Sequence, residues 1–110
     1  MARDLGLEDL VREDLPRGLA FEERAMFGGR AWLLDGNLTL GARSTGLLVR
    51  LGKGHDAWAL ALPDIEPMIM RGRALSGWVR AGPDAYGDDA LRARLIAAAV
   101  AFVRTLPPKT

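Results

Sequence analysis

The sequence predicts an α+β fold of two layers, with three helices packed against an antiparallel, meandering sheet of five to six strands. Apolar residues at helical spacing near both ends of the chain, and short alternating segments separated by glycine-containing turns between them, support this prediction. The expected order is one helix, three to four strands, a second helix, two strands and a closing helix. Residues 1–110 are expected to form a single domain.

The first helix is predicted from an N-terminal cap and an apolar stripe. Asp4 is a favourable capping residue, and Leu7, Leu10 and Val11 follow it at the spacing of one helix face. Pro16 and Gly18 are expected to end this helix.

Turn signals divide the next part of the chain into strands. Asp35-Gly36-Asn37 separates the apolar segments 31–34 and 38–40, which is typical of a β-hairpin. Ser44-Thr45-Gly46 forms a second turn before a strand over residues 47–51.

The last third of the chain predicts two helices and two strands. A short helix is expected over residues 55–62, ended by Pro63, and strands are expected over 68–71 and 77–81. Asp88 is expected to cap the closing helix, whose apolar stripe contains Leu91, Leu95, Ala98, Phe102 and Leu106.

Strand alternation divides the predicted sheet into two faces. One face is purely apolar and is expected under the helices: Ala31, Leu33, Leu38, Leu40, Ala42, Leu47, Val49, Leu51, Met68, Met70, Val79 and Ala81. The other face mixes large apolar groups with arginines: Trp32, Leu34, Thr39, Arg43, Leu48, Arg50, Ile69, Arg71, Trp78 and Arg80. A loop or the first helix covers part of this mixed face, or it is the surface that contacts a partner.

Composition excludes several classes of protein. The 110 residues include no cysteine and one histidine, which excludes disulfides, thiolate zinc sites and cysteine nucleophiles. Seven acidic and three basic side chains lie in residues 1–23, whereas residues 24–80 carry eight basic and four acidic ones. Neither a signal peptide nor a membrane-spanning segment is recognisable, so we expect a cytoplasmic protein.

No set of residues predicts catalysis, a cofactor or a metal ion. The paired carboxylates Glu8-Asp9, Glu13-Asp14, Glu22-Glu23 and Asp88-Asp89 are interpreted as solvated faces and caps. His55 is interpreted as a residue of a first helical turn, and the glycine-containing segments lack the spacing of a phosphate-binding loop.

Nucleic-acid binding is an alternative to protein binding. Trp32 and Trp78 could stack on bases, while the phosphate contacts would come from Arg43, Arg50, Arg71, Arg73 and Arg80. Against this, the net charge is only +1 and no helix-turn-helix pattern is present.

The most distinctive segment is Arg24-Ala25-Met26-Phe27-Gly28-Gly29, followed by the hairpin around Asp35-Gly36. It resembles the N-terminal domain of the TfoX/Sxy family of bacterial competence regulators, which has an R-x-M-F-G-G motif and a D/N-G hairpin. Val49-Arg50, Pro67-Met68 and Gly77-Trp78-Val79 match later parts of the family pattern, and the resemblance covers residues 5–109. Met26, Phe27, Gly28 and Gly29 are expected to have a structural role, the first two in a strand and the glycines in a bulge or a positive-φ turn between strands.

The resemblance implies a fold similar to type III secretion chaperones, which are small α+β proteins that often dimerise. It also implies a non-enzymatic regulatory domain that contacts proteins. Full-length members carry a second domain that resembles helix-hairpin-helix DNA-binding modules, and residues 1–110 correspond to the first domain alone. We therefore expect a stand-alone interaction domain that forms a homodimer through the mixed tryptophan and arginine face.

Overall fold

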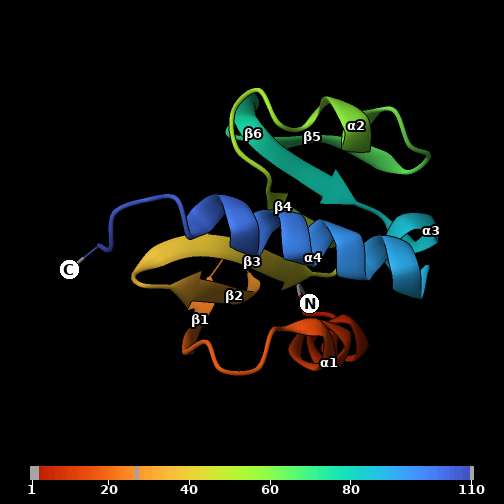
Figure 1. The fold of residues 1–110 in the computed structure, drawn as a ribbon. Helices are drawn as coiled ribbons and strands as arrows, with labels where there is room; N and C mark the ends of the chain where they lie inside the picture. The colour runs from red at the N-terminus through yellow and green to blue at the C-terminus, as the bar shows by residue number, and fades with distance from the viewer. Residues whose placement is uncertain (1–2, 27, 110) are drawn as a thin grey trace.

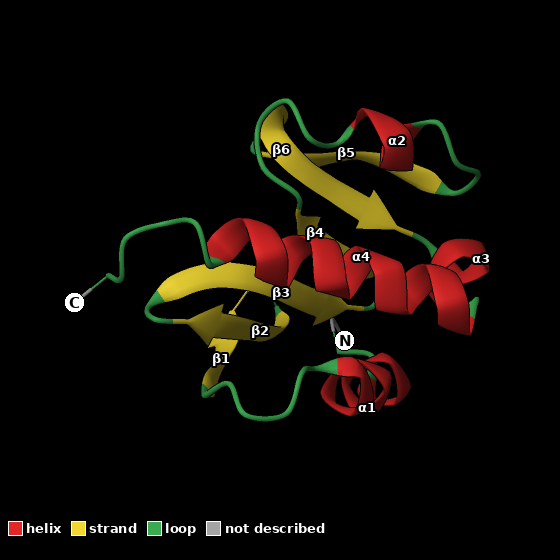
Figure 2. Ribbon diagram, in the orientation of Figure 1, coloured by secondary structure: helices red, strands yellow, loops and turns green. Residues whose placement is uncertain are grey.

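Six strands form one antiparallel sheet and four helices accompany it in the computed structural model, which describes residues 3–26 and 28–109 (Figures 1 and 2). The elements in chain order are α1 (Leu5–Asp14), β1 (Phe21–Met26), β2 (Gly29–Leu34), β3 (Asn37–Arg43), β4 (Gly46–Arg50), α2 (Ala57–Leu60), β5 (Ile65–Met70), β6 (Arg73–Ala81), α3 (Pro83–Tyr86) and α4 (Asp89–Val103).

The strands follow the spatial order β1-β2-β3-β4-β6-β5, so β1 and β5 are the two edges of the sheet. This arrangement confirms the predicted α+β class, and β1 to β4 form a meander as predicted, whereas β6 rather than β5 pairs with β4. Both strands of the last hairpin are longer than predicted, because β5 begins at Ile65 and β6 begins at Arg73. The short helix α3 was not predicted, although Pro83 occupies its first turn, a position that proline favours.

Local capping signals correctly predict where the two long helices begin. The Asp4 carboxylate accepts a hydrogen bond from the Leu7 amide at 3.0 Å, and the Asp88 carboxylate accepts one from the Leu91 amide at 3.0 Å. Each cap satisfies a backbone N–H group that has no partner within its helix. The bounds of the short helix predicted over residues 55–62 are less accurate. Helix α2 spans only Ala57–Leu60, so His55 precedes the helix and is not part of its first turn.

All four helices contribute buried residues to one apolar cluster on a single face of the sheet. Helix α4 lies across the middle of this face in Figure 1, and α1 lies beside it. The helical members are Leu7, Val11, Ala59, Ala85, Leu95, Ile96, Ala99, Val100 and Val103. No described helix packs on the opposite face of the sheet, although Leu33 and Leu48 on that face are buried.

The predicted division of the two sheet faces is correct for β4 and for the ends of β3 and β6. Leu40, Ala42, Leu47, Val49 and Leu51 join the helix-covered cluster as expected, and Val79 and Ala81 do so too.

The division is wrong for β2, because Trp32 and Leu34 lie in the helix-covered cluster in place of Ala31 and Leu33. The cause is an irregularity in the β2–β3 pairing: Trp32 is opposite Leu40, but Leu33 is opposite Leu38. Leu38 and Leu40 therefore face opposite sides of the sheet although they are two residues apart.

A second irregularity interrupts the pairing of β5 with β6. The register shifts between Pro67 and Ile69. Ile65 joins the helix-covered cluster, whereas Met68 is buried outside it and Met70 is half-buried. Neither Met68 nor Met70 therefore belongs to the helix-covered cluster, in which both were expected.

The Asp35-Gly36 hairpin is confirmed, and it has a second structural role. Asp35 has a φ of 53° and Gly36 a φ of 78°, as a two-residue turn of this kind requires. The Lys109 amide donates to the Asp35 carbonyl at 2.7 Å, and a Cβ at Gly36 would clash with the Lys109 backbone. The turn therefore holds the segment that follows α4.

The glycines of the predicted motif have the structural role expected of them. Gly28 has a φ of 73°, and a Cβ at Gly29 would clash with the Ala42 carbonyl of the neighbouring strand. Met26 is half-buried at the end of β1. Phe27 lies outside the described residues.

Candidate interaction surface

The face of the sheet that no described helix covers, called here the open face, carries several partly exposed apolar side chains. Trp78 and Leu38 are half-buried on it, and Ile69 is 55% exposed. A shallow groove of about 510 Å³ lies on the same face and is lined by Arg43, Thr45, Glu66, Pro67, Ile69 and Arg80. Apolar groups that remain accessible on one sheet face are typical of a contact surface.

Three of the arginines predicted for this surface are bonded to other parts of the protein. Arg43 Nε donates to Thr45 Oγ1 at 2.8 Å, and Arg50 Nη1 donates to the Leu38 carbonyl at 3.0 Å. Arg80 donates to the Thr45 carbonyl at 2.8 Å and to the Glu66 carboxylate. These guanidinium groups therefore organise the open face, and they are not a free positive patch.

Arg50 also contacts two aromatic rings. Its guanidinium carbon lies 6.0 Å from the Trp78 ring centre and 5.7 Å from the Phe102 ring centre. The strand register places Arg50 directly opposite Trp78 on β6. Both distances are at the outer limit of a cation–π contact.

Arg71 and Arg73 occupy a different place from the other predicted arginines. They lie in and beside the exposed turn that joins β5 to β6. Neither makes an ion pair or a side-chain hydrogen bond within residues 3–26 and 28–109. The structure therefore separates the predicted surface into a bonded group around the groove and two unpaired arginines at the hairpin tip.

Trp32 does not belong to any accessible surface, which corrects its prediction as a partner-binding or base-stacking residue. Its side chain is 1% exposed and lies in the helix-covered cluster. The indole N–H donates to Glu23 Oε1 at 3.1 Å, so the polar part of the ring also has a partner.

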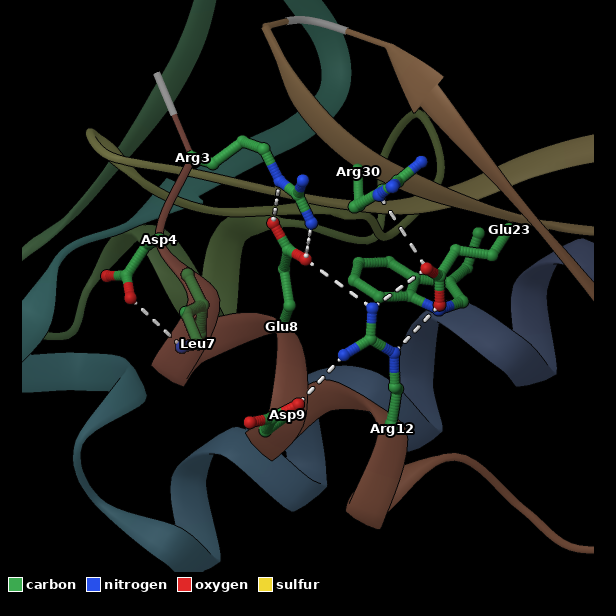
Figure 3. Close-up of polar contacts among 9 residues, drawn as sticks. Arg3, Asp4, Leu7, Glu8, Asp9, Arg12, Glu23 and Arg30 are labelled. Atoms are coloured by element: carbon green, nitrogen blue, oxygen red, sulfur yellow. Dashed lines mark hydrogen bonds and ion pairs between the residues drawn. The ribbon is translucent and has the colours of Figure 1, made fainter. Parts of the chain in front are cut away.

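A network of charged side chains joins α1 to β1 and β2 (Figure 3). Glu8 is completely buried, and its carboxylate accepts hydrogen bonds from Arg3 at 2.8 Å and 3.0 Å. Arg12 lies 3.4 Å from the same carboxylate and also bonds Glu23 at 2.8 Å and 2.9 Å. The interpretation of Glu8 and Glu23 as merely solvated acids is therefore wrong.

The network affects the protonation of its acids. The pKa of Glu8 lies below its ordinary value because Arg3 donates hydrogen bonds to the charged form, although burial opposes this effect. The pKa of Glu23 is lowered in the same way by Arg12. Arg30 Nε is buried without a hydrogen-bond partner among the described residues and lies 3.7 Å from Glu23 Oε2.

The sequence contains a signal for this network. Glu8 follows Leu7 and precedes Val11 by three residues, so it lies on the buried side of α1. A carboxylate within an apolar helical stripe needs a cation, and Arg12 is four residues further on.

A second buried ion pair connects the first and last long helices. Arg92 on α4 is 4% exposed and donates to Asp14 at 2.7 Å and to the Tyr86 carbonyl at 2.8 Å. Asp89 lies 2.9 Å from the same guanidinium. The Tyr86 hydroxyl donates to Asp4 at 3.2 Å, and burial raises the pKa of Tyr86.

An open apolar groove of about 620 Å³ lies between α2 and the second half of α4. Trp58 and Phe102 are half-buried in its walls, and His55 is exposed beside them. The Arg94 guanidinium lies 4.0 Å from the centre of the Trp58 ring. The convergent polar groups that fix a small ligand are few here.

The described residues form neither a cluster of metal ligands nor a membrane-spanning helix. No group of three or more histidine, cysteine, aspartate and glutamate side chains is arranged to hold a metal ion in residues 3–26 and 28–109. Over the same ranges, every helix is too short or too polar to cross a membrane.

The fold and the open face define the class of protein: a two-layer α+β domain in which one sheet face packs against helices and the other does not. The model of the TfoX N-terminal domain family matches residues 16–103, and the chain belongs to this family, which is associated with competence regulation. Comparisons with curated proteins and with solved structures gave no match.

Proposed function

We propose that this TfoX N-terminal domain is a non-enzymatic regulatory module of the cytoplasm that contacts proteins and forms a homodimer through its open face. Family membership supports a regulatory role. The observation that carries the proposal is the apolar group on the open face, where Ile69 is 55% exposed and Trp78 and Leu38 are half-buried.

The arrangement of Trp78 supports a contact surface for a protein. Tryptophan and arginine are the residue types that contribute most to binding energy at protein interfaces. The Arg50 guanidinium carbon lies 6.0 Å from the Trp78 ring centre, so the two residue types are neighbours on this face. A standard interface covers about 800 Å² on each partner, which is roughly one eighth of the 6243 Å² surface of this chain.

Nucleic-acid association, the alternative function, has less support. It required Arg43, Arg50, Arg71, Arg73 and Arg80 to act together on phosphates, but three of these have internal partners. The burial of Trp32 removes one of the two candidate stacking residues. Direct DNA binding by this domain would therefore depend on few contacts.

Sedimentation of the purified protein tests the homodimer. We expect the wild-type protein to sediment with the mass of two chains, and Ile69→Glu to sediment as a monomer because it places a charge in the contact. Leu5→Glu is the matched control, since Leu5 is 62% exposed but lies on α1.

Circular dichroism of both variants shows whether they are folded, so that a change in sedimenting mass can be distinguished from unfolding. A folded wild-type protein that stays monomeric at the highest soluble concentration would overturn the homodimer. A dimer that persists in Ile69→Glu would show that the open face is not its interface.

A further inference from the structure

The turn between β5 and β6 contains an arginine in an unfavourable backbone conformation. Arg71 has a φ of 53° and the following Gly72 a φ of 77°, while Met70 and Arg73 pair across the end of the hairpin. The β2–β3 turn has the same form, with Asp35 at 53° and Gly36 at 78°. Aspartate, asparagine and glycine tolerate this conformation, whereas other residues pay about 1–2 kcal/mol for it.

No contact of the Arg71 side chain with the described residues offsets the cost of this backbone conformation. Its side chain is exposed and forms no hydrogen bond or ion pair there, and the same holds for Arg73. Arg43, Arg50 and Arg80, by contrast, each bond a neighbouring group. A strained residue with an unused guanidinium group indicates a role outside the folded domain.

A third cation lies near the same hairpin. The loop at Lys53 packs against β6, since a Cβ at Gly77 would come within 2.6 Å of the Lys53 amide nitrogen. Gly77 is four residues from Arg73, or about 13 Å along a strand. No carboxylate occurs between Pro67 and Arg80, so this region attracts anionic groups.

Apolar side chains lie next to these cations. Met70 is opposite Arg73, and Leu75 is two residues further along β6 on the same side as Arg73; both apolar residues are half-buried. Ile69 and Ala74 face the other side of the hairpin, towards the open face. The hairpin therefore has a basic and apolar side that is distinct from the proposed dimer contact.

The number of cations at this hairpin that have no partner within residues 3–26 and 28–109 favours one of two kinds of anionic partner. Three cations neutralise at most three phosphates, which gives a salt slope of roughly −2.7, whereas tight DNA binders use about 6–10 such contacts. Arginine and methionine together are typical of protein interfaces. The observations therefore favour a protein segment over a nucleic acid.

We propose that the β5–β6 hairpin tip, through Arg71 and Arg73, with Lys53 further along β6, binds an acidic segment of a partner protein whose apolar side chains pack on Met70 and Leu75. This inference rests on the proposed protein-interaction function, but it does not require the homodimer. It assigns the partner chemistry: carboxylates at short spacing with aliphatic residues between them.

Fluorescence anisotropy with a labelled peptide of alternating glutamate and leucine tests the proposal. We expect saturable binding that weakens with added salt and is about tenfold weaker for Arg71→Asn, which removes one charge-assisted contact. Arg17→Asn is the matched control, because it removes an exposed arginine elsewhere. A peptide with glutamine in place of glutamate should not bind.

Arg71→Asn also provides a readout without any ligand. Asparagine favours the left-handed region, so this variant should have a higher Tm than the wild-type protein while it loses peptide binding. Equal peptide affinity of Arg71→Asn and the wild-type protein would overturn the proposal. Tighter binding of a DNA duplex than of the peptide, lost in the same variant, would overturn it in favour of nucleic acid. A sedimentation measurement on each sample separates these outcomes from failure of the homodimer.

Discussion

The Glu8 carboxylate has no exposed surface, and Arg3 holds it with two hydrogen bonds of 2.8 Å and 3.0 Å. The arginine comes from the segment that precedes α1, and the acid comes from the buried side of the helix. This pair therefore ties the start of the described chain to the core. A buried charge that loses its partner is costly, because no water replaces the lost hydrogen bonds.

Arg3→Ala should therefore lower the Tm of the protein clearly, since Glu8 would keep only the 3.4 Å contact with Arg12. Arg24→Ala is the matched control: Arg24 pairs with Glu22 at 2.6 Å, but both side chains are more than half exposed. Exposed pairs contribute little to stability. Thermal unfolding followed by circular dichroism compares the two, and equal Tm values would contradict a structural role for the buried pair.

The charge network should also make the stability of the protein depend on pH in the acid range. Folding lowers the pKa of Glu8 and of Glu23 below the ordinary value of 4.5. The folded state then binds fewer protons than the unfolded chain, so the free energy of unfolding decreases as the pH falls through the lowered pKa values. The two glutamates make their full contribution to the free energy of unfolding at pH values above their ordinary pKa.

Urea unfolding between about pH 5 and pH 3 measures this dependence. Glu23→Gln should show a smaller loss of stability over that interval than the wild-type protein. Glu13→Gln should follow the wild-type curve, because Glu13 is exposed and makes no ion pair in the described residues. A Glu23→Gln curve parallel to the wild-type curve would mean that the network does not set the acid sensitivity.

The two tryptophans of the predicted surface should respond differently to the same substitution. Trp32→Phe should reduce the free energy of unfolding by about 1–3 kcal/mol, because it removes buried volume and leaves Glu23 with one donor fewer. Trp78→Phe should cost much less in a monomeric sample, since Trp78 is only half-buried. Equilibrium unfolding in urea measures both values, and similar losses would contradict the assignment of Trp32 to the core.

Glycine substitutions can separate backbone strain from close packing at the β2–β3 turn. Gly36→Ala introduces a side chain at a φ of 78° and against Lys109. Gly18→Ala introduces the same strain at a φ of 88°, but no atom lies within 4 Å of the new Cβ. Gly18→Ala should cost about 1–2 kcal/mol, and Gly36→Ala should cost more.

Hydrogen exchange of the Lys109 amide shows whether Gly36→Ala releases the segment after α4. Its exchange should become faster in Gly36→Ala and stay unchanged in Gly18→Ala. Unchanged protection in both variants would mean that the turn does not hold this segment.

Local signals in the sequence predict much of this fold. The caps at Asp4 and Asp88 and the turn at Asp35-Gly36 depend only on neighbouring residues, so short patterns are enough to find them. Strand periodicity also predicts the helix-covered face of β4, but it does not predict that β6 lies between β4 and β5. What these patterns miss is non-local: the position of Trp32 depends on a pairing irregularity between two strands.

The sequence also cannot show which arginines of the predicted surface have partners within the protein. The alternation pattern groups five arginines on one face but carries no information on their partners. Arg80 bonds Glu66 and the Thr45 carbonyl, which are brought to it by β5 and by the β3–β4 turn. Only a three-dimensional arrangement distinguishes such arginines from Arg71, which has no partner in the described residues.

The ion pair between Asp14 and Arg92 has a consequence for where this domain begins. The family match starts at residue 16, yet α1 places Leu7 and Val11 in the common core and supplies a carboxylate to a guanidinium that is 4% exposed. A chain shortened to the matched residues 16–103 would lose these groups, and it would also lose the segment that Asn37 and Asp35 hold. We therefore expect residues 16–103 alone to be less stable than a chain that includes α1 and the segment after α4.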